Sequence, residues 1–168
     1  YNYARYVREC IESVKNQEGA TFEHIIQDAG STDGTLDILN SYPHLKLHVE
    51  KDSGMSEGIN RGFRKARGKW VMWLNTDDRL LPGALAAVKA FADSRPDADI
   101  VHGAWNFIGP DGALQRPMKA LPYSLNMHIW YGTYLASTAL FLRRSTTIEE
   151  GFLLDERFRY CLLYTSPS

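Results

Sequence analysis

Two adjacent carboxylates, Asp77 and Asp78, are the residues of this chain whose types and spacing best suit a chemical role. They closely follow the apolar run 70–74, so we expect them at the end of a buried strand. In open α/β sheets, ligands bind at the carboxyl ends of the strands. Paired carboxylates with no basic neighbour closer than Arg79 suit a hard divalent cation that bridges to phosphate oxygens. The structural alternative is an N-cap, because a helix is expected from about Pro82.

A second polar segment, residues 28–35, also follows a short apolar run. Gly30 and Gly34 allow a positive φ there, and Ser31 can bond the exposed amides of a following helix. A strand, turn and helix with ordinary capping would produce residues 31–35 unaided. Only Asp28 and Ser31 are candidates for a chemical role in addition to this structural one.

Residues 50–54, which read Glu-Lys-Asp-Ser-Gly, lead into a helix that carries Asn60. Ser53 is placed to cap this helix, so much of the segment has a structural explanation. Lys51 and Asp52 are the candidates for a chemical role. The alternative for Lys51 is a solvated surface charge.

The elements that must position these segments alternate between helix and strand, which predicts a parallel sheet covered on both faces. Apolar residues at helical spacing predict helices within 4–14, 36–42, 55–66 and 85–91. Short apolar or alternating runs predict strands at 22–27, 45–49, 70–74, from 100 onward and at 137–142. The continuous apolar run 70–74 is typical of a central parallel strand. A turn is expected at 109–112, which reads Gly-Pro-Asp-Gly.

Composition narrows the class of protein. The chain has 168 residues, 44% of them hydrophobic and 23% charged, which describes one soluble globular domain. A formal net charge of −1 argues against a nucleic-acid partner held by charge. No apolar stretch approaches the roughly 20 residues needed to cross a bilayer. Two distant cysteines, Cys10 and Cys161, favour reduced thiols, and we expect a cytoplasmic protein.

The three polar segments, in this order, resemble the inverting family 2 glycosyltransferases of the GT-A fold. Members of that family commonly read "DGGSTDGT", then "DA.N.G", then "LNSDD". The resemblance runs from Tyr1 to about Tyr160. It implies an α/β fold, a Rossmann-like GT-A sandwich that is incomplete here, with residues 1–160 forming a partial glycosyltransferase domain.

The resemblance also implies roles for individual residues. Asp78 would ligate Mn²⁺ or Mg²⁺, and Asp77 would contact the metal or the donor's ribose. Asp28 and Ser31 would contact the nucleobase and ribose, although Ala29 stands where many members carry a second acid. The remaining donor-binding residues would be Lys51, Asp52 and Asn60.

Both ends depart from the family pattern. Members carry a strand ahead of the dipeptide that matches Tyr1-Asn2. Residues 161–168 replace the expected "DYDLW" or "DYELW" helix, and we interpret them as a non-native tail. The family's catalytic aspartate falls at Leu163, so no catalytic residue is intact.

The function implied for the full-length parent is metal-dependent transfer of a sugar from a nucleoside-diphosphate sugar, such as a UDP-sugar, to an acceptor hydroxyl with inversion. The acceptor would be a glycan or a lipid-linked molecule, which would bring the protein to the inner face of the membrane. One alternative is an inactive remnant that binds nucleotide. A nucleotidyltransferase is a weaker alternative, because its glycine-rich phosphate loop is not visible in the chain.

Overall fold

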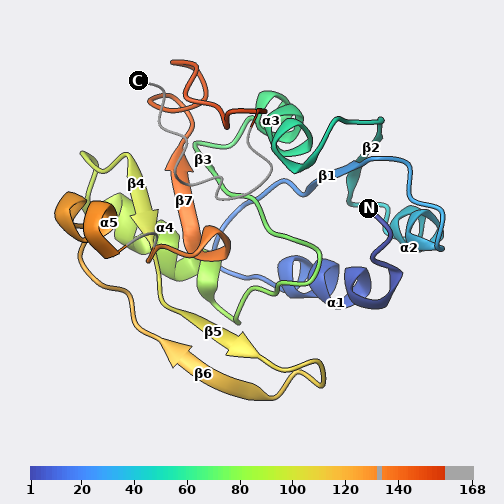
Figure 1. Ribbon diagram of the computed structural model, residues 1–168, viewed down its shortest axis with the longest axis horizontal. Coiled ribbons are helices and arrows are strands. Elements are labelled where there is room, and N and C mark those ends of the chain that lie inside the picture. Colours follow the sequence, from blue (N-terminus) through green and yellow to red (C-terminus); the bar gives the residue numbers. More distant parts are fainter. Residues whose placement is uncertain (132–133, 158–168) are drawn as a thin grey trace.

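A computed structural model describes residues 1–131 and 134–157 of the chain (Figure 1). Its elements, in chain order, are α1 (Ala4–Lys15), β1 (Ile25–Asp28), α2 (Thr35–Asn40), β2 (Lys46–Val49), α3 (Met55–Lys65), β3 (Trp70–Val71), α4 (Ala84–Ser94), β4 (Ile100–His102), β5 (Trp105–Ile108), β6 (Leu114–Met118), α5 (Leu125–Tyr131), a short 3₁₀ helix (Ser137–Ala139) and β7 (Leu140–Arg143). The mixed α/β class expected from the sequence is therefore confirmed. Across these described ranges, every helix is too short or too polar to span a bilayer.

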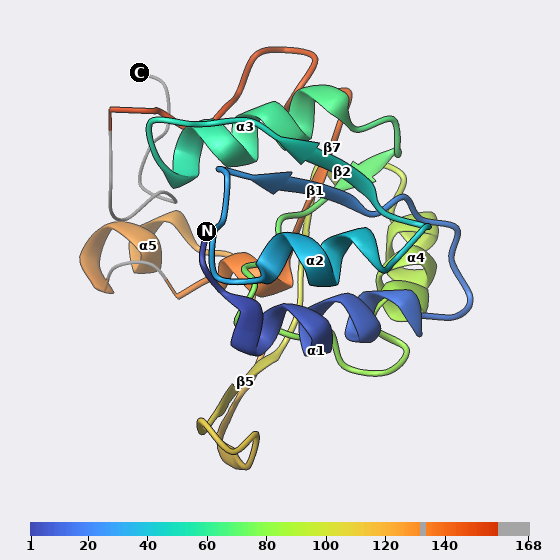
Figure 2. The ribbon, with the colours of Figure 1, turned by 90° about the vertical axis from the view of Figure 1, so that its right-hand side faces the viewer.

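The strands form three separate ladders. β1 and β2 pair in parallel, as expected, with Ile26 opposite Leu47. β3 and β4 both pair antiparallel with β7, which lies between them. β5 and β6 form an antiparallel hairpin that projects from the body of the molecule (Figure 2).

The expectation of a wholly parallel sheet with 70–74 as its central strand is wrong. β3 covers only Trp70 and Val71, and its partner β7 runs in the opposite direction. An apolar run reports that a strand is buried, but it does not report the direction of the strand beside it. Here that neighbour comes from a segment about 70 residues further along the chain.

Helices cover both faces of the strands. α1 and α2 lie on one side of the β1–β2 pair and α3 lies on the other (Figure 2). On the first side, Val7, Ile11 and Leu39 form a buried cluster. On the second, Phe63 of α3 meets Trp73 edge to face, with ring centroids 5.9 Å apart. Burying such side chains contributes roughly 1.5–3 kcal/mol each.

A large cavity separates β1 from β3. Its volume is about 1520 Å³, and its lining includes both strands together with apolar residues of α1 and α3. The same lining extends beyond the strands to residues 28–30, 51–54 and 75–77. The polar segments identified in the sequence therefore border one space.

The first turn of α1 is attached to the turn that follows β1. The backbone N–H of Asn2 donates to Ser31 Oγ at 2.8 Å, and the N–H of Tyr3 donates to Thr35 Oγ1 at 3.1 Å. The Ala4 N–H donates to Asp33 Oδ2 at 3.0 Å. The first N–H groups of a helix have no partner within the helix, so these side chains satisfy them and hold α1 against the end of β1.

The burial of His24, just before β1, can be tested through the pH dependence of stability. Burial, with a smaller effect from His44, lowers the pKa of His24 to about 4. Because the unfolded chain binds this proton at a higher pH, the contribution to stability is present above about pH 6.5 and is lost as the pH falls toward 4. We expect a loss of up to about 3 kcal/mol from this group. When the free energy of unfolding is measured in urea from pH 7 to 4, it should fall less steeply in His24→Phe than in the parent chain, whereas in His48→Gln it should fall as in the parent chain. Equal declines in both variants would contradict the account.

Candidate functional site

The Asp77–Asp78 pair lies in a turn beyond β3. Asp77 is exposed and Asp78 is half-buried. Asn75 holds the second carboxylate in place, because its Nδ2 donates to Asp78 Oδ2 at 3.1 Å and its carbonyl accepts the Asp78 N–H at 3.0 Å. The N-cap of α4 is Gly83, five residues past Asp78. The capping explanation offered by the sequence is therefore wrong.

Among the residues that the structure describes, no Lys or Arg side chain forms an ion pair with Asp77 or Asp78. Burial raises the pKa of Asp78, the bond from Asn75 lowers it, and the neighbouring Asp77 raises it further. Arg79, the nearest basic residue in sequence, pairs instead with Glu9 at 2.6 Å. The two carboxylates thus remain available to a positive ligand.

Cys10 of α1 lies beside the same turn, and its Sγ is 3.6 Å from the carbonyl oxygen of Asn75. Burial raises the pKa of this thiol to about 12, with further contributions from Asp78 and Asp77. The thiol therefore stays protonated at neutral pH and is not a nucleophile. Its role here is to pack α1 against the acidic turn.

Asp28, at the end of β1, is 4% exposed, and its carboxylate is largely occupied by the turn that follows. Oδ1 accepts the N–H of Gly30 at 2.8 Å and of Ser31 at 2.7 Å, and Oδ2 accepts the Ser31 hydroxyl at 2.7 Å. The Ser31 hydroxyl in turn accepts the N–H of Asn2. Asp28 and Ser31, which were predicted to bind the nucleotide-sugar donor, thus shape the turn at this edge of the cavity.

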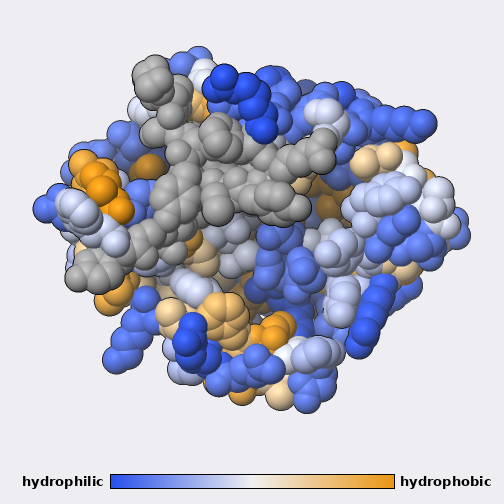
Figure 3. All heavy atoms as spheres, viewed as in Figure 1, coloured by the Kyte–Doolittle hydropathy of each residue, from blue (hydrophilic) through white to orange (hydrophobic). Residues whose placement is uncertain are grey.

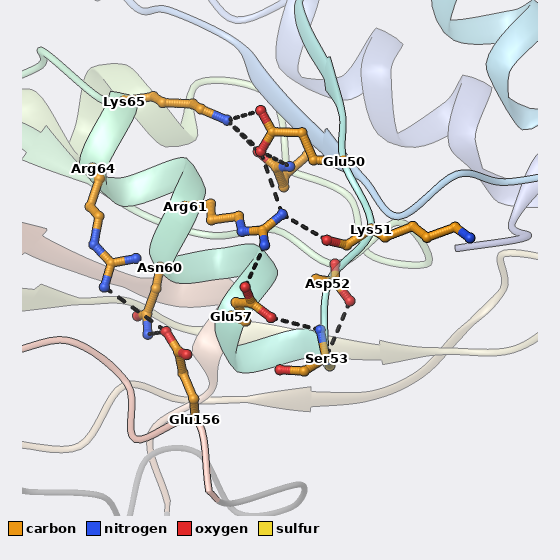
Figure 4. A network of polar contacts seen from close by, with 12 residues as sticks. Glu50, Lys51, Asp52, Ser53, Glu57, Asn60, Arg61, Arg64, Lys65 and Glu156 are labelled. Atoms are coloured by element: carbon orange, nitrogen blue, oxygen red, sulfur yellow. Dashed lines mark hydrogen bonds and ion pairs between the residues drawn. The ribbon is translucent and has the colours of Figure 1, made fainter.

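The loop before α3 is held by the first two turns of that helix (Figure 4). Arg61 donates to the carbonyl oxygen of Lys51 at 2.8 Å and pairs with Glu57. Glu57 accepts the N–H of Ser53 at 2.6 Å, and this bond, followed by the bond from Arg61, lowers its pKa to about 2. Asp52 is half-buried, and the exposed Lys51 side chain extends away from α3.

The structure corrects one detail and adds one contact in this loop. The N-cap of α3 is Gly54 without a side-chain bond, so the expected cap by Ser53 is wrong. The pair of Glu57 and Arg61, which fixes the loop, was not identified as part of the site. Its i, i+4 spacing was the available signal. A Cβ on Gly58 would lie 3.0 Å from Asp52 Oδ2, which explains why glycine suits that position.

The residues predicted to bind the nucleotide-sugar donor do not all line the cavity between β1 and β3. The cavity between β1 and β3 is lined by Asp28, Lys51, Asp52 and Asp77. Asn60 is 1% exposed, and its side chain bonds residues 154 and 156 instead. In the space-filling view, hydrophilic residues run through the middle of one face, and apolar residues lie in separate groups around them (Figure 3). The predicted catalytic position, Leu163, lies outside the described residues.

Solved structures share this fold. The structure of residues 1–349 of S. aureus TarS superposes with a TM-score of 0.72 at 24% identity and covers 96% of this chain, which covers 50% of that one. The same TarS fragment in complex with UDP gives a TM-score of 0.71. At this identity the likeness shows the fold, which is that of a GT-A glycosyltransferase.

Sequence relatives give the family. A glycosyltransferase of PGL/p-HBAD biosynthesis from Mycobacterium bovis is 36% identical over 108 residues, which are 61% of this chain and 42% of the relative. Chondroitin synthase of Pasteurella multocida is 30% identical over 119 residues, 68% of this chain and 12% of that protein. The chain thus spans less than half the length of these relatives. The sequence profile of glycosyl transferase family 2 matches residues 1–151, and the chain therefore belongs to that family.

Proposed function

We propose that this chain forms the nucleotide-sugar site of a metal-dependent glycosyltransferase. The observation that carries the proposal is the pair Asp77–Asp78 in the turn beyond β3, which has no ion-pair partner within the described ranges and lies at the cavity that Asp28, Lys51 and Asp52 also line. The family match and the fold shared with a UDP-bound neighbour support it. The donor would be a UDP-sugar or another nucleoside-diphosphate sugar.

The residues present fit a hard divalent cation. Asp78 is held in a fixed position by Asn75 and would be a ligand, and the exposed Asp77 would contact the metal or the ribose. The described ranges contain no group of three or more acidic, histidine or cysteine side chains able to hold an ion. A site with only one or two protein carboxylates is sufficient for Mg²⁺ or Mn²⁺, because substrate phosphates supply the other ligands. When bound, such an ion would neutralise the charge that develops on the departing diphosphate.

The other residues would orient the donor. Three bonds from the turn occupy Asp28, and a carboxylate has about four acceptor sites, so one site remains for the ribose or base. Lys51 would bring a positive charge to the phosphates from a loop held by Arg61. Ser31 and Asp52 would border the base and ribose. A donor-binding role for Asn60 requires its side chain to leave the contacts described above.

The reaction would be a single displacement. An acceptor hydroxyl attacks the anomeric carbon, the bond from that carbon to the diphosphate oxygen breaks, and a carboxylate base takes the hydroxyl proton. The acceptor would be a glycan or a lipid-linked molecule, reached at the inner face of the membrane. Leu163 at the family's base position favours a second candidate function, nucleotide binding without transfer.

Removal of the metal ligand is the direct test of the proposed site. Asp78→Ala should weaken UDP binding in the presence of Mn²⁺ by about tenfold or more, because the cation that links carboxylate and phosphate is lost. Without Mn²⁺ the variant and the parent chain should bind equally weakly. Calorimetry of UDP with and without Mn²⁺ measures both. The control is Asp97→Ala, an exposed acid that does not line the cavity. Unchanged manganese-dependent affinity in Asp78→Ala would refute the metal assignment.

Asp28 should matter for stability as well as for binding. Asp28→Ala leaves two backbone N–H groups and the Ser31 hydroxyl without their acceptor, so we expect a loss of roughly 2–4 kcal/mol. Asp37→Ala, on the exposed side of α2, should change stability by less than about 1 kcal/mol. Chemical denaturation measures both. An unaltered unfolding midpoint in Asp28→Ala would show that its carboxylate does not hold the turn.

The chain as it stands should bind nucleotide but transfer sugar at no useful rate. Leucine at position 163 accepts no proton, and general-base assistance contributes about 10²–10⁴-fold. Incubation with UDP-sugars, Mn²⁺ and a panel of acceptors, with UDP release as the readout, tests this. Turnover comparable to that of a full-length relative would overturn the expectation.

A further inference from the structure

Helix α3 holds two separate segments with two different rows of side chains (Figure 4). One row, Glu57, Arg61 and Lys65, bonds the loop 50–53 at the border of the cavity. The other row, Asn60 and Arg64, faces Glu156, which comes nearly a hundred residues later in the chain. Each row has the i, i+4 spacing that places side chains on one side of a helix.

Asn60 carries most of the second contact. Its Nδ2 donates to the carbonyl oxygen of Leu154 at 2.8 Å and to Glu156 Oε1 at 2.9 Å, and its Oδ1 accepts the Leu154 N–H at 2.9 Å. Because the Leu154 N–H can only donate, the orientation of the amide is fixed. Asn60 is 1% exposed, and both the N–H donors and the oxygen acceptor of its amide bond the short segment 154–156.

Alternative explanations for Asn60 fit the contacts less well. A buried asparagine that only filled space would be costly, since an unpaired buried polar group costs about 1–3 kcal/mol. A donor ligand would point into the cavity that Asp28 and Asp77 line, and Asn60 does not line it. Its bonds instead bridge elements that are 94 residues apart in the chain.

We propose that Asn60 is a positioning residue, which fixes the segment 154–156 to α3 and so holds Glu156 at a set distance from the donor loop. The helix serves both rows, so the loop 50–53 and the carboxylate of Glu156 share one rigid support. Any effect of this arrangement on sugar transfer rests on the proposed function. The contact itself does not, and the two can be tested separately.

Hydrogen exchange of the whole chain tests the proposal. Asn60→Ala should accelerate exchange of the Leu154 amide at least about tenfold, because its acceptor is removed, while β1 amides keep their protection. UDP affinity with Mn²⁺ should stay within about twofold. The matched control, Arg61→Ala, lies on the other row and should loosen residues 51–53 without affecting Leu154.

A second variant separates positioning from general stability. In Asn60→Asp, a neutral carboxyl group can donate to the Leu154 carbonyl or to Glu156 as the amide does, whereas the ionised form still accepts the Leu154 N–H but cannot donate and repels Glu156, which Arg64 faces. Protection of Leu154, corrected for the intrinsic effect of pH on exchange, should therefore fall as the pH rises and the carboxyl group ionises, whereas in the parent chain it should not. This result also decides the matter if Asn60→Ala does not fold.

Three results would overturn the proposal. They are unchanged exchange at Leu154 in Asn60→Ala, equal acceleration in β1 and at Leu154, and loss of UDP affinity as large as in Asp78→Ala. The last would make Asn60 a donor ligand. Failure of the parent chain to bind UDP would instead count against the proposed function and leave the exchange result intact.

Discussion

Repulsion between the adjacent carboxylates of Asp77 and Asp78 is the interaction on which the proposed site depends. β1 ends at Asp28, and the chain beyond β3 brings Asp77 and Asp78 to the border of the same cavity. The fold treats these acids differently. Asp28 accepts bonds from N–H and hydroxyl donors of the turn that follows it, whereas among the described residues Asn75 is the one whose side chain donates to Asp78. Under the proposed function, this acidic pair beside a large cavity would receive a cation and the anion that the cation carries.

The surroundings of the acidic pair preserve that charge. Glu9 engages Arg79, which would otherwise be free to neutralise the turn. The protonated Cys10 thiol adds no charge of its own. On the opposite side of the cavity, Arg61 and Glu57 fix the loop that presents Lys51 and Asp52. The acidic turn and the loop 50–53 therefore contact different helices: Cys10 of α1 lies against the turn and Arg61 of α3 bonds the loop, and the two helices lie on opposite sides of the β1–β2 pair (Figure 2).

The sequence predicted those parts of the structure that depend on local pattern. The strand end at Asp28 follows from an apolar run, and α1 and α3 follow from helical spacing, whereas β3 ends at Val71 and not at the end of the apolar run 70–74. It could not predict that β7 would pair antiparallel with β3, because a continuous apolar run carries no information about the direction of its neighbour. Nor could local pattern reveal the partner of Asn60, since Leu154 lies 94 residues away. The resemblance predicted a donor-binding role for Asn60, which stays a prediction, and it did not predict the bonds of this side chain to Leu154 and Glu156.

Paramagnetic broadening of amide signals by Mn²⁺ in the presence of UDP tests the central claim most directly. We expect the amides of Asp77, Asp78 and Ser31 to broaden first, because the proposed ion would lie at their edge of the cavity, while the turn at 147–151, which follows β7 beside the start of β3, stays sharp. Replacement of Mn²⁺ by Mg²⁺ should restore the signals. Broadening centred on His24 and His44, which precede β1 and β2 and whose rings lie 5.7 Å apart, would place the ion elsewhere and contradict the assignment.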